Sequence, residues 1–205
     1  SDVCSSDLGN SGYSVTATSG DDASNKNFGN FKNITISGTK FEDENGNGTF
    51  DQGEVGLSGW TVQLTKNGNA FDSKVTGNDG SYSFSDLGPG VYGLSEQTQS
   101  GWTQTYGNSG YSVTATSGDD ASNKNFGNFK NISISGTKFE DENGNGSYDQ
   151  SEIGLSGWTV VLTKNGNVSD STVTGTDGSY NFSDLGPGTY SVSEQTQSGW
   201  TQTYG

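Results

Sequence analysis

The 205-residue chain contains no His, no Met, only two Pro residues and a single Cys. Without His, its Ser and Thr residues lack the base that usually activates a nucleophile. No apolar run approaches the roughly 18 residues that a membrane-spanning helix needs. Basic residues are also scarce, because nine Lys and Arg face 24 Asp and Glu for a formal net charge of −15. This acidic balance argues against nucleic acid and anionic membrane as partners, and it suits the binding of cations.

The one Cys, Cys4, lies in the opening octapeptide SDVCSSDL, which belongs to no repeat of the chain. A lone Cys can form an intermolecular disulfide or carry a lipid. The octapeptide also reads as the translation of a sequencing adapter, and we therefore treat residues 1–8 as a non-native segment outside the fold. The chain from Gly9 onward then has no disulfide.

Most of the chain is a tandem repeat, because Trp60 and Trp158, and likewise Trp102 and Trp200, stand 98 positions apart. A period of this size predicts one small domain per repeat. Residues 34–131 form one complete domain. Residues 9–33 correspond to the C-terminal strands of a preceding repeat, and residues 132–205 correspond to a repeat that lacks those last strands.

Short alternating segments separated by turn signals predict an all-β fold. In 60–66 the apolar side chains fall at every second position, and the alternation recurs in 34–41, 81–84 and 91–97. The dipeptide Asn67-Gly68 supplies the positive φ angles of a tight hairpin. No segment has a helical period, so we expect tandem β-sandwich domains.

One loop in each repeat gathers oxygen-bearing side chains. The segment DENGNGTFDQGE fits the calcium-loop pattern D-x-[DN]-x-[DN]-G-x5-E at every specified position. Calcium takes six to eight oxygens, here from side chains, from the backbone carbonyl at position 7 and from a bidentate Glu at position 12. Strands flank this loop, whereas helices flank it in EF-hands. The predicted calcium ligands are Asp43, Asn45, Asn47, Thr49, Asp51 and Glu54, and in the second repeat Asp141, Asn143, Asn145, Ser147, Asp149 and Glu152.

Two further expectations concern residues near these loops. Phe50 and Tyr148, at position 8 of the pattern, are expected to hold the loops against the core. Asp119 and Asp120 are a lesser candidate for a further ion.

The motifs ISGTKFEDENGNG and DGSYSFSDLGPGVYGLSE resemble the B-repeat domain of serine-aspartate-repeat surface adhesins, a relative of the transthyretin-like B-type domain of collagen adhesins. The resemblance covers the chain from Gly9 onward. It implies an extracellular, cell-surface or secreted stalk module that binds calcium and has neighbouring repeats as its partners. It implies Ig-like or transthyretin-like β-sandwiches as the fold.

Two other functions compete with a stalk. An enzyme is not expected, because the carboxylates gather in loops that calcium already explains. A glycan- or protein-binding module is the alternative, since Trp102 and Trp200 would offer a surface for stacking. Core or inter-domain packing is the commoner role for a Trp in an alternating strand.

A covalent cross-link is a separate expectation. Lys40 and Glu96 share the strand parity of inward-facing apolar neighbours, and burial of unpaired charges is costly. Relatives of the collagen-adhesin type often join an inward Lys to an Asn of the last strand, with an inward Glu as catalyst. The Asn would here be Asn128, with Asn125 as the alternative. A plain buried ion pair is the competing interpretation.

The repeat also predicts an association between copies. The segment GYSVTATSGDDASNKNFGNF occurs at 12–31 and again at 110–129. Because 132–205 lacks these strands, its sheets would have open edges that the 12–31 segment of another copy fits. We therefore expect head-to-tail strand complementation between copies.

Overall fold

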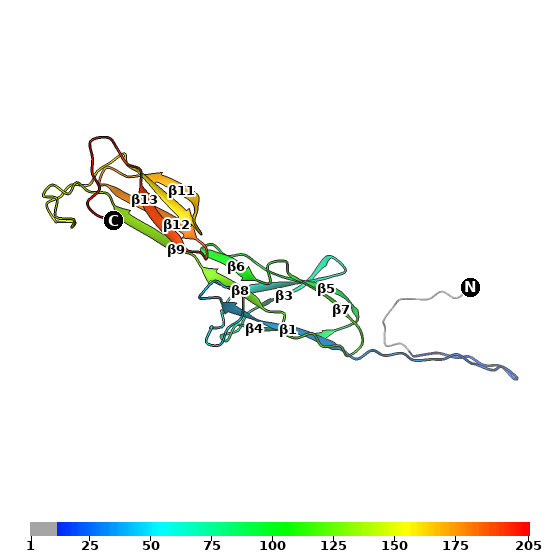
Figure 1. The fold of residues 1–205 in the computed structure, drawn as a ribbon. Helices are drawn as coiled ribbons and strands as arrows, with labels where there is room; N and C mark the ends of the chain where they lie inside the picture. The colour runs from blue at the N-terminus through cyan, green and yellow to red at the C-terminus, as the bar shows by residue number, and fades with distance from the viewer. Residues whose placement is uncertain (1–11) are drawn as a thin grey trace.

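A computed structural model describes residues 12–205, so the segment predicted to be non-native lies outside the described residues. Within this range the chain forms two β units joined end to end (Figure 1), and no helix is long and apolar enough to cross a membrane. The strands are β1 (Ile34–Glu42), β2 (Thr61–Lys66), β3 (Asn69–Val75), β4 (Ser81–Leu87), β5 (Gly90–Glu96), β6 (Trp102–Tyr106), β7 (Tyr111–Ala115), β8 (Phe126–Lys130), β9 (Ile132–Thr137), β10 (Thr159–Lys164), β11 (Asn167–Val173), β12 (Ser179–Leu185) and β13 (Tyr190–Glu194).

The first unit, residues 34–131, contains two four-stranded sheets. One sheet has the order β4-β1-β8-β6 and the other has the order β3-β2-β5-β7. Strand β8 runs parallel to β1 and antiparallel to β6, so the last strand of the unit lies between an early strand and a middle one. The β2–β3 hairpin turns at Asn67 and Gly68, whose φ angles of 50° and 82° confirm the tight turn expected from the sequence.

The core of the first unit comes from the predicted alternation. Val62 and Leu64 of one sheet and Phe84 and Phe126 of the other are fully buried or nearly so. Eleven buried side chains form this core cluster. Each large apolar side chain contributes about 1.5–3 kcal/mol by leaving water, so this core accounts for the stability of a small domain without disulfides.

The second unit, residues 132–205, repeats only part of this arrangement. Strands β12 and β9 form one sheet, and the other has the order β11-β10-β13. Nothing among the described residues occupies the places that β7 and β8 hold in the first unit. Its buried cluster has three members, Val160, Leu162 and Phe182, against eleven in the first unit. The second unit is therefore the less stable of the two.

The tail, residues 12–33, carries no strand, although the same sequence forms β7 and β8 in the first unit. It projects from the first unit on the side away from the second unit (Figure 1). The tail nevertheless keeps local contacts of the folded segment. The Tyr13 hydroxyl donates to the Asn27 carbonyl at 2.6 Å, as Tyr111 donates to Asn125 at 2.5 Å. This sequence therefore forms strands only where neighbouring strands are present to pair with it.

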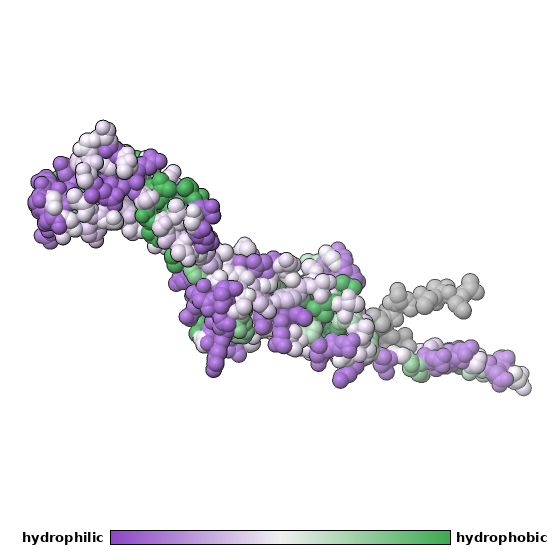
Figure 2. Space-filling view, in the orientation of Figure 1, coloured by the Kyte–Doolittle hydropathy of each residue, from purple (hydrophilic) through white to green (hydrophobic). Residues whose placement is uncertain are grey.

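The two units meet through the loop of the first and a turn of the second. A side chain added at Gly46 would place its Cβ 2.2 Å from Cβ of Pro187, and one at Gly186 would lie 3.0 Å from Oγ1 of Thr103. The connecting Asn131 is fixed on both sides, because its N–H donates to the Gly101 carbonyl at 2.9 Å and its side chain accepts from Thr103 at 2.6 Å. The surface is mainly hydrophilic, with apolar colour on the second unit near this junction (Figure 2).

Candidate metal loops and buried lysine cluster

The first predicted calcium loop begins directly after β1, and the second begins at Asp141, a few residues after the end of β9 at Thr137. Asp43 follows β1 directly and has no exposed surface. Its Oδ1 accepts the Asn47 N–H at 3.1 Å and its Oδ2 accepts the Gly48 N–H at 2.8 Å, so the carboxylate closes the loop upon itself. The Asp43 N–H in turn donates to the Asn128 carbonyl at 2.9 Å, which ties the loop to β8.

The amide side chains of the loop converge on one carboxylate. Asn45 and Asn47 donate their side-chain N–H groups to Oδ2 of Asp51 at 3.1 and 2.7 Å. These hydrogen bonds hold the pKa of Asp51 below its ordinary value. Both Asn side chains therefore direct their amide nitrogens toward the Asp51 carboxylate, where a bound cation would require their amide oxygens. A half-turn of each amide reverses this and presents two oxygens.

One carboxylate oxygen of Glu54 is buried without a hydrogen-bond donor or a cation beside it. Its Oε2 accepts the Asp51 N–H at 2.9 Å, whereas its Oε1 is buried without a hydrogen-bond partner. Burial raises the pKa of Glu54, and the negative charges of Asp43 and Asp51 raise it further. A buried carboxylate oxygen without a donor is costly, and a cation would satisfy it.

The second loop repeats this geometry. Gly146 donates to Asp141 at 2.8 Å, Asn143 and Asn145 donate to Asp149 at 3.0 and 2.9 Å, and Oε1 of Glu152 is again buried without a partner. Hydrogen bonding, chiefly from Thr203, lowers the pKa of Asp141. Because the Glu at position 12 has an unpaired Oε1 in both loops, this feature belongs to the motif and does not depend on the surroundings of one loop.

The donor set fits calcium and excludes a site built from carboxylates alone. Among residues 12–205, no three His, Cys, Asp or Glu side chains lie close enough to hold a metal by themselves. Amide and backbone oxygens would therefore have to complete the shell of any bound ion, and a shell of such hard oxygens is typical of calcium. The ring of Phe50 stacks on Phe41 at 4.3 Å and that of Tyr148 on Phe139 at 4.6 Å, which is the anchoring role predicted for them.

The acidic pair at 119–120 has other partners in the structure. Asp120 accepts the Thr35 N–H at 2.7 Å, and Asp119 accepts the Thr116 hydroxyl. These contacts bind the loop before β8 to β1 and leave no feature that points to an ion.

The predicted cross-link residues lie together inside the first unit. Lys40 has no exposed surface, and Nζ lies 3.0 Å from Oε2 of Glu96. Lys40 also donates to the side-chain oxygen of Asn128, which is 2% exposed. We call these three residues the lysine cluster. The alternative, Asn125, instead accepts the Thr39 N–H at 2.9 Å through its side-chain oxygen.

Burial shifts both ionisable groups of the lysine cluster toward neutrality. It lowers the pKa of Lys40 from 10.5 to about 8, although the nearby Glu96 carboxylate opposes the shift. Burial raises the pKa of Glu96, against the opposing effects of Lys40 and Asn128. Although Oε2 meets the distance of an ion pair, neither Glu96 oxygen has a well-formed hydrogen bond. The direction of both shifts favours the neutral amine and the protonated carboxyl, which are the forms that amide exchange would use.

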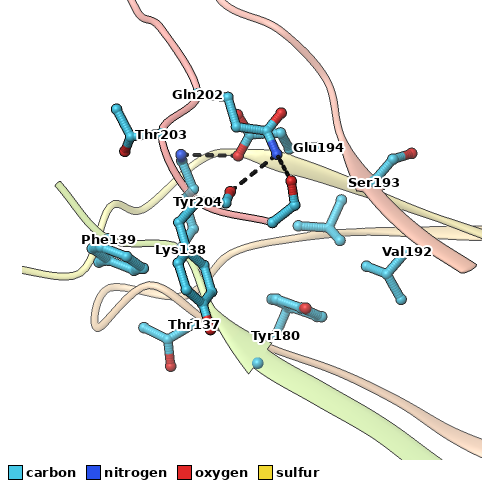
Figure 3. Close-up of a pocket in the computed structure, with 13 residues that line it drawn as sticks. Thr137, Lys138, Phe139, Tyr180, Val192, Ser193, Glu194, Gln202, Thr203 and Tyr204 are labelled. Carbon is cyan, nitrogen blue, oxygen red and sulfur yellow. Dashed lines mark hydrogen bonds and ion pairs between the residues drawn. The ribbon is translucent and has the colours of Figure 1, made fainter. Parts of the chain in front are cut away.

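Sequence reasoning missed two features of this cluster. Nζ of Lys40 lies 4.3 Å from the ring centre of Trp60, so the ammonium form has a π-face as well as a carboxylate. The second unit also holds a partial copy, in which Lys138 Nζ lies 2.8 Å from Oε2 of Glu194 with no Asn beside them (Figure 3). The 98-residue period would have located this pair from Lys40 and Glu96.

The two Trp residues proposed for ligand stacking take part in packing. Trp102 meets Trp60 edge-on at 5.5 Å, and Trp200 meets Trp158 at the same distance. Trp102 is half-buried and Trp200 is 46% exposed. The packing interpretation therefore has a specific contact in both units.

Comparison with known proteins agrees with the repeat. The family model of the SdrD B-like domain matches residues 34–138 and 132–205. Serine-aspartate repeat-containing protein D of Staphylococcus aureus (strain Newman) is 36% identical over an alignment 205 residues long that covers 93% of this chain. Serine-aspartate repeat-containing protein F of Staphylococcus epidermidis is 37% identical over 176 residues, which cover 80% of this chain. The chain spans only 16% and 10% of the length of these two relatives.

The matches to solved structures have low TM-scores and low sequence identity. A streptococcal ancillary pilin matches 83% of this chain, and 56% of its own, with a TM-score of 0.42 and 16% identity. The minor pilin GBS52 of Streptococcus agalactiae matches 83% of this chain, and 86% of its own, with a TM-score of 0.38 and 15% identity.

Proposed function

The chain belongs to the family of SdrD B-like domains, and from this premise we propose that it is a calcium-stabilised spacer repeat in the stalk of a large extracellular, adhesin-like surface protein. Its partners are the neighbouring repeats of the same chain. We propose a structural and not an enzymatic role, because Lys40, Glu96 and Asn128 are buried inside the first unit.

One observation carries the calcium part of this proposal. Each unit buries one Glu oxygen without a donor at position 12 of a loop that also gathers two Asp and two Asn side chains. Calcium would satisfy Glu54 and Glu152 in the same way, while Asp43 and Asp141 bind the loop backbone and orient the shell. We expect two ions for each chain, one in each loop.

The position of the first loop supports a role in stiffening the stalk. Gly46 lies in the loop and packs against Pro187 of the next unit, so an ordered loop would fix the angle between the units. Without a cation, the acidic loop repels itself and opens more readily. Calcium would thus act on the shape of the stalk as well as on the stability of each unit.

A covalent bond in the lysine cluster is the second part of the proposal. Neutral Lys40 would attack Cγ of Asn128, form an amide bond between Nζ and Cγ, and release the side-chain nitrogen as ammonia. Protonated Glu96 would donate its proton to the leaving nitrogen and take up the proton that Nζ releases, so no oxidant or other reactant is needed. A bond between β1 and β8 joins the first and last strands of the unit, which suits a module that bears tension.

Calorimetric titration tests the proposal most simply. The chain should bind two calcium ions, Glu54→Gln should remove one site, and Glu54→Gln with Glu152→Gln should remove both. Absence of binding heat in a chain freed of calcium would refute calcium stabilisation. Peptide mapping of the first unit then tests the cross-link separately, by a peptide pair joined through Lys40 and Asn128 with the loss of one ammonia.

A further inference from the structure

Strand β3 forms an open edge of the first unit. Among the described residues it pairs only with β2, as the outermost strand of the sheet β3-β2-β5-β7, and all seven of its residues are exposed. Just beyond the strand, the Thr76 N–H donates to the Trp60 carbonyl at 2.9 Å, toward β2. Because the direction of the backbone groups alternates along an antiparallel strand, those of Ser73 and Val75 point away from the sheet.

The outward N–H of Ser73 has a local acceptor in place of a strand. It donates to Oδ1 of the preceding Asp72 at 2.7 Å. Nζ of Lys74 lies 3.1 Å from Oδ2 of the same carboxylate, and the Lys74 and Asp72 side chains are 45% and 42% exposed. An exposed ion pair of this kind contributes little stability, so both charged groups can exchange partners at small cost.

Charged side chains usually protect an edge strand from pairing with another chain, but the charges of β3 are self-complementary. Since residues with outward backbone groups must face each other, an antiparallel pair of β3 strands centres on Asp72, Ser73 or Lys74. Centred on Ser73, the pair places Asp72 of each copy opposite Lys74 of the other. Either other centre places like charges opposite each other, which destabilises the pair. The charges therefore select one register.

The selected register also brings exposed apolar side chains together. Phe71 is 53% exposed and Val75 is 65% exposed. Phe71 is the extra residue of a β-bulge, and its ring meets that of Tyr92 edge-on at 6.1 Å. With Ser73 at the centre, Phe71 of one copy comes beside Val75 of the other, so pairing withdraws part of both side chains from water.

The second unit has the same edge without the complementarity. Its strand β11 is also exposed, and the Ser171 N–H donates to Asp170 at 2.7 Å, as in β3. However, Thr172 stands in the place of Lys74, and Ser169 stands in the place of Phe71. A pair of β11 strands would therefore set Asp170 opposite a neutral side chain.

We propose that two copies of this chain associate through their β3 strands, paired antiparallel with Ser73 on a twofold axis. Each sheet β3-β2-β5-β7 then continues into the same sheet of the second copy, and the contact is closed by its symmetry. The strands of the first unit run along the length of the molecule (Figure 1), so paired molecules lie side by side and point in opposite directions. The spacer thus has a lateral contact in addition to its end-to-end contacts.

The association should be weak. Residues 71–75 of each copy form the contact, whereas a stable interface takes roughly 20–30 residues a side. The net charge of −15 also repels a second copy, although physiological salt screens charges that lie more than about 8 Å apart. The measurement is therefore made at high protein concentration, in physiological salt and with calcium.

An exchange of charge between positions 72 and 74 tests the register. Asp72→Lys and Lys74→Asp each set like charges opposite each other, so sedimentation equilibrium should show that each variant alone dimerises at least tenfold more weakly than the unaltered chain. An equal mixture of the two variants restores both opposite-charge pairs and should dimerise as the unaltered chain does. Asp170→Lys is the matched control, because it makes the same change of charge in β11 and should leave dimerisation unchanged.

Trapping by a disulfide tests the twofold axis. Residues opposite each other in a hydrogen-bonded antiparallel pair have Cα atoms about 5.5 Å apart, within the range that a disulfide spans. With Cys4→Ser in both proteins, Ser73→Cys should form covalent dimers on mild oxidation, and Ser171→Cys should not. Equal trapping of the two, a monomeric unaltered chain, or a mixture that fails to restore dimers would overturn the proposal.

Calcium titration of the same samples separates this inference from the proposed function. Dimers with these charge effects, in a chain that gives no binding heat with calcium, would support the β3 pairing and refute calcium stabilisation. A chain that binds calcium and stays monomeric would refute the β3 pairing and support the proposed function.

Discussion

Replacement of Glu54 by Gln should change the stability of the first unit in opposite directions with and without calcium. With calcium bound, the variant loses the ligand expected to supply two oxygens, so its melting temperature should fall. In chelator, the variant loses a carboxylate that is half-buried beside Asp43 and Asp51 and has one oxygen without a donor. Its melting temperature in chelator should therefore equal or exceed that of the unaltered chain.

The magnitude follows from the linkage of binding to folding. A ligand at a hundred times its Kd stabilises the folded state by about 2.7 kcal/mol. For a domain of this size, each kcal/mol shifts the melting temperature by about 4–8 °C. We therefore expect calcium to raise the melting of the first unit by about 10–20 °C, and Glu54→Gln to remove most of that rise.

Scanning calorimetry resolves the effect, because the smaller core of the second unit should give a separate, earlier transition. Glu54→Gln should move only the later transition, and Glu152→Gln only the earlier one. Glu44→Gln is the matched control, since it removes the same charge from an exposed loop position outside the ligand set. The reasoning fails if Glu44→Gln and Glu54→Gln behave alike, or if calcium leaves both transitions unmoved.

Three further outcomes are expected. In chelator, the first unit should gain stability in chemical denaturation as pH falls toward 4.5, because burial raises the pKa values of Glu54 and Glu96 above that ordinary value, so the folded state binds more protons. Asp51, Asp72 and Asp79, whose pKa values hydrogen bonds lower, oppose this gain as pH approaches 3.8, and a loss of stability before that point would contradict the assignment. Asn128→Ala should abolish the ammonia loss in the first unit and accelerate its unfolding under force, and an unchanged peptide map would exclude the bond. Gly46→Ala should broaden the distribution of distances between the units in spin-label measurements, whereas Gly144→Ala, which shares its positive φ but meets nothing within 4 Å, should not; equal effects would place the cause in the loop and not in the junction.

The all-β fold, its repeat and the inward direction of Lys40 and Glu96 were predictable because strand parity alone decides which side chains face the core. Of the two candidate Asn residues, the structure brings Asn128, and not Asn125, to Lys40. The family was also predictable, because contiguous motifs carry the resemblance, and the match of the SdrD B-like family model confirms it. The calcium ligands stay a prediction, although the buried oxygens of Glu54 and Glu152 agree with it.

Features that depend on long-range contact were not predictable. The parallel pairing of β8 with β1 is a choice between sheet edges that a strand pattern does not encode. The tail shows the same limit, because one sequence forms β7 and β8 at 110–129 and no strand at 12–31. The contact of Gly46 with Pro187 joins two loops 141 positions apart, for which no local signal exists.

Small-angle X-ray scattering with calcium and with chelator tests the central claim, that calcium makes this chain a stiff spacer, most directly. With calcium, the distance distribution should show two units at one fixed separation, with a maximum dimension near that of the extended molecule. In chelator, the distribution should broaden and shift to shorter distances, and Glu54→Gln should show the broad form even with calcium. Identical scattering in calcium and chelator would contradict the account.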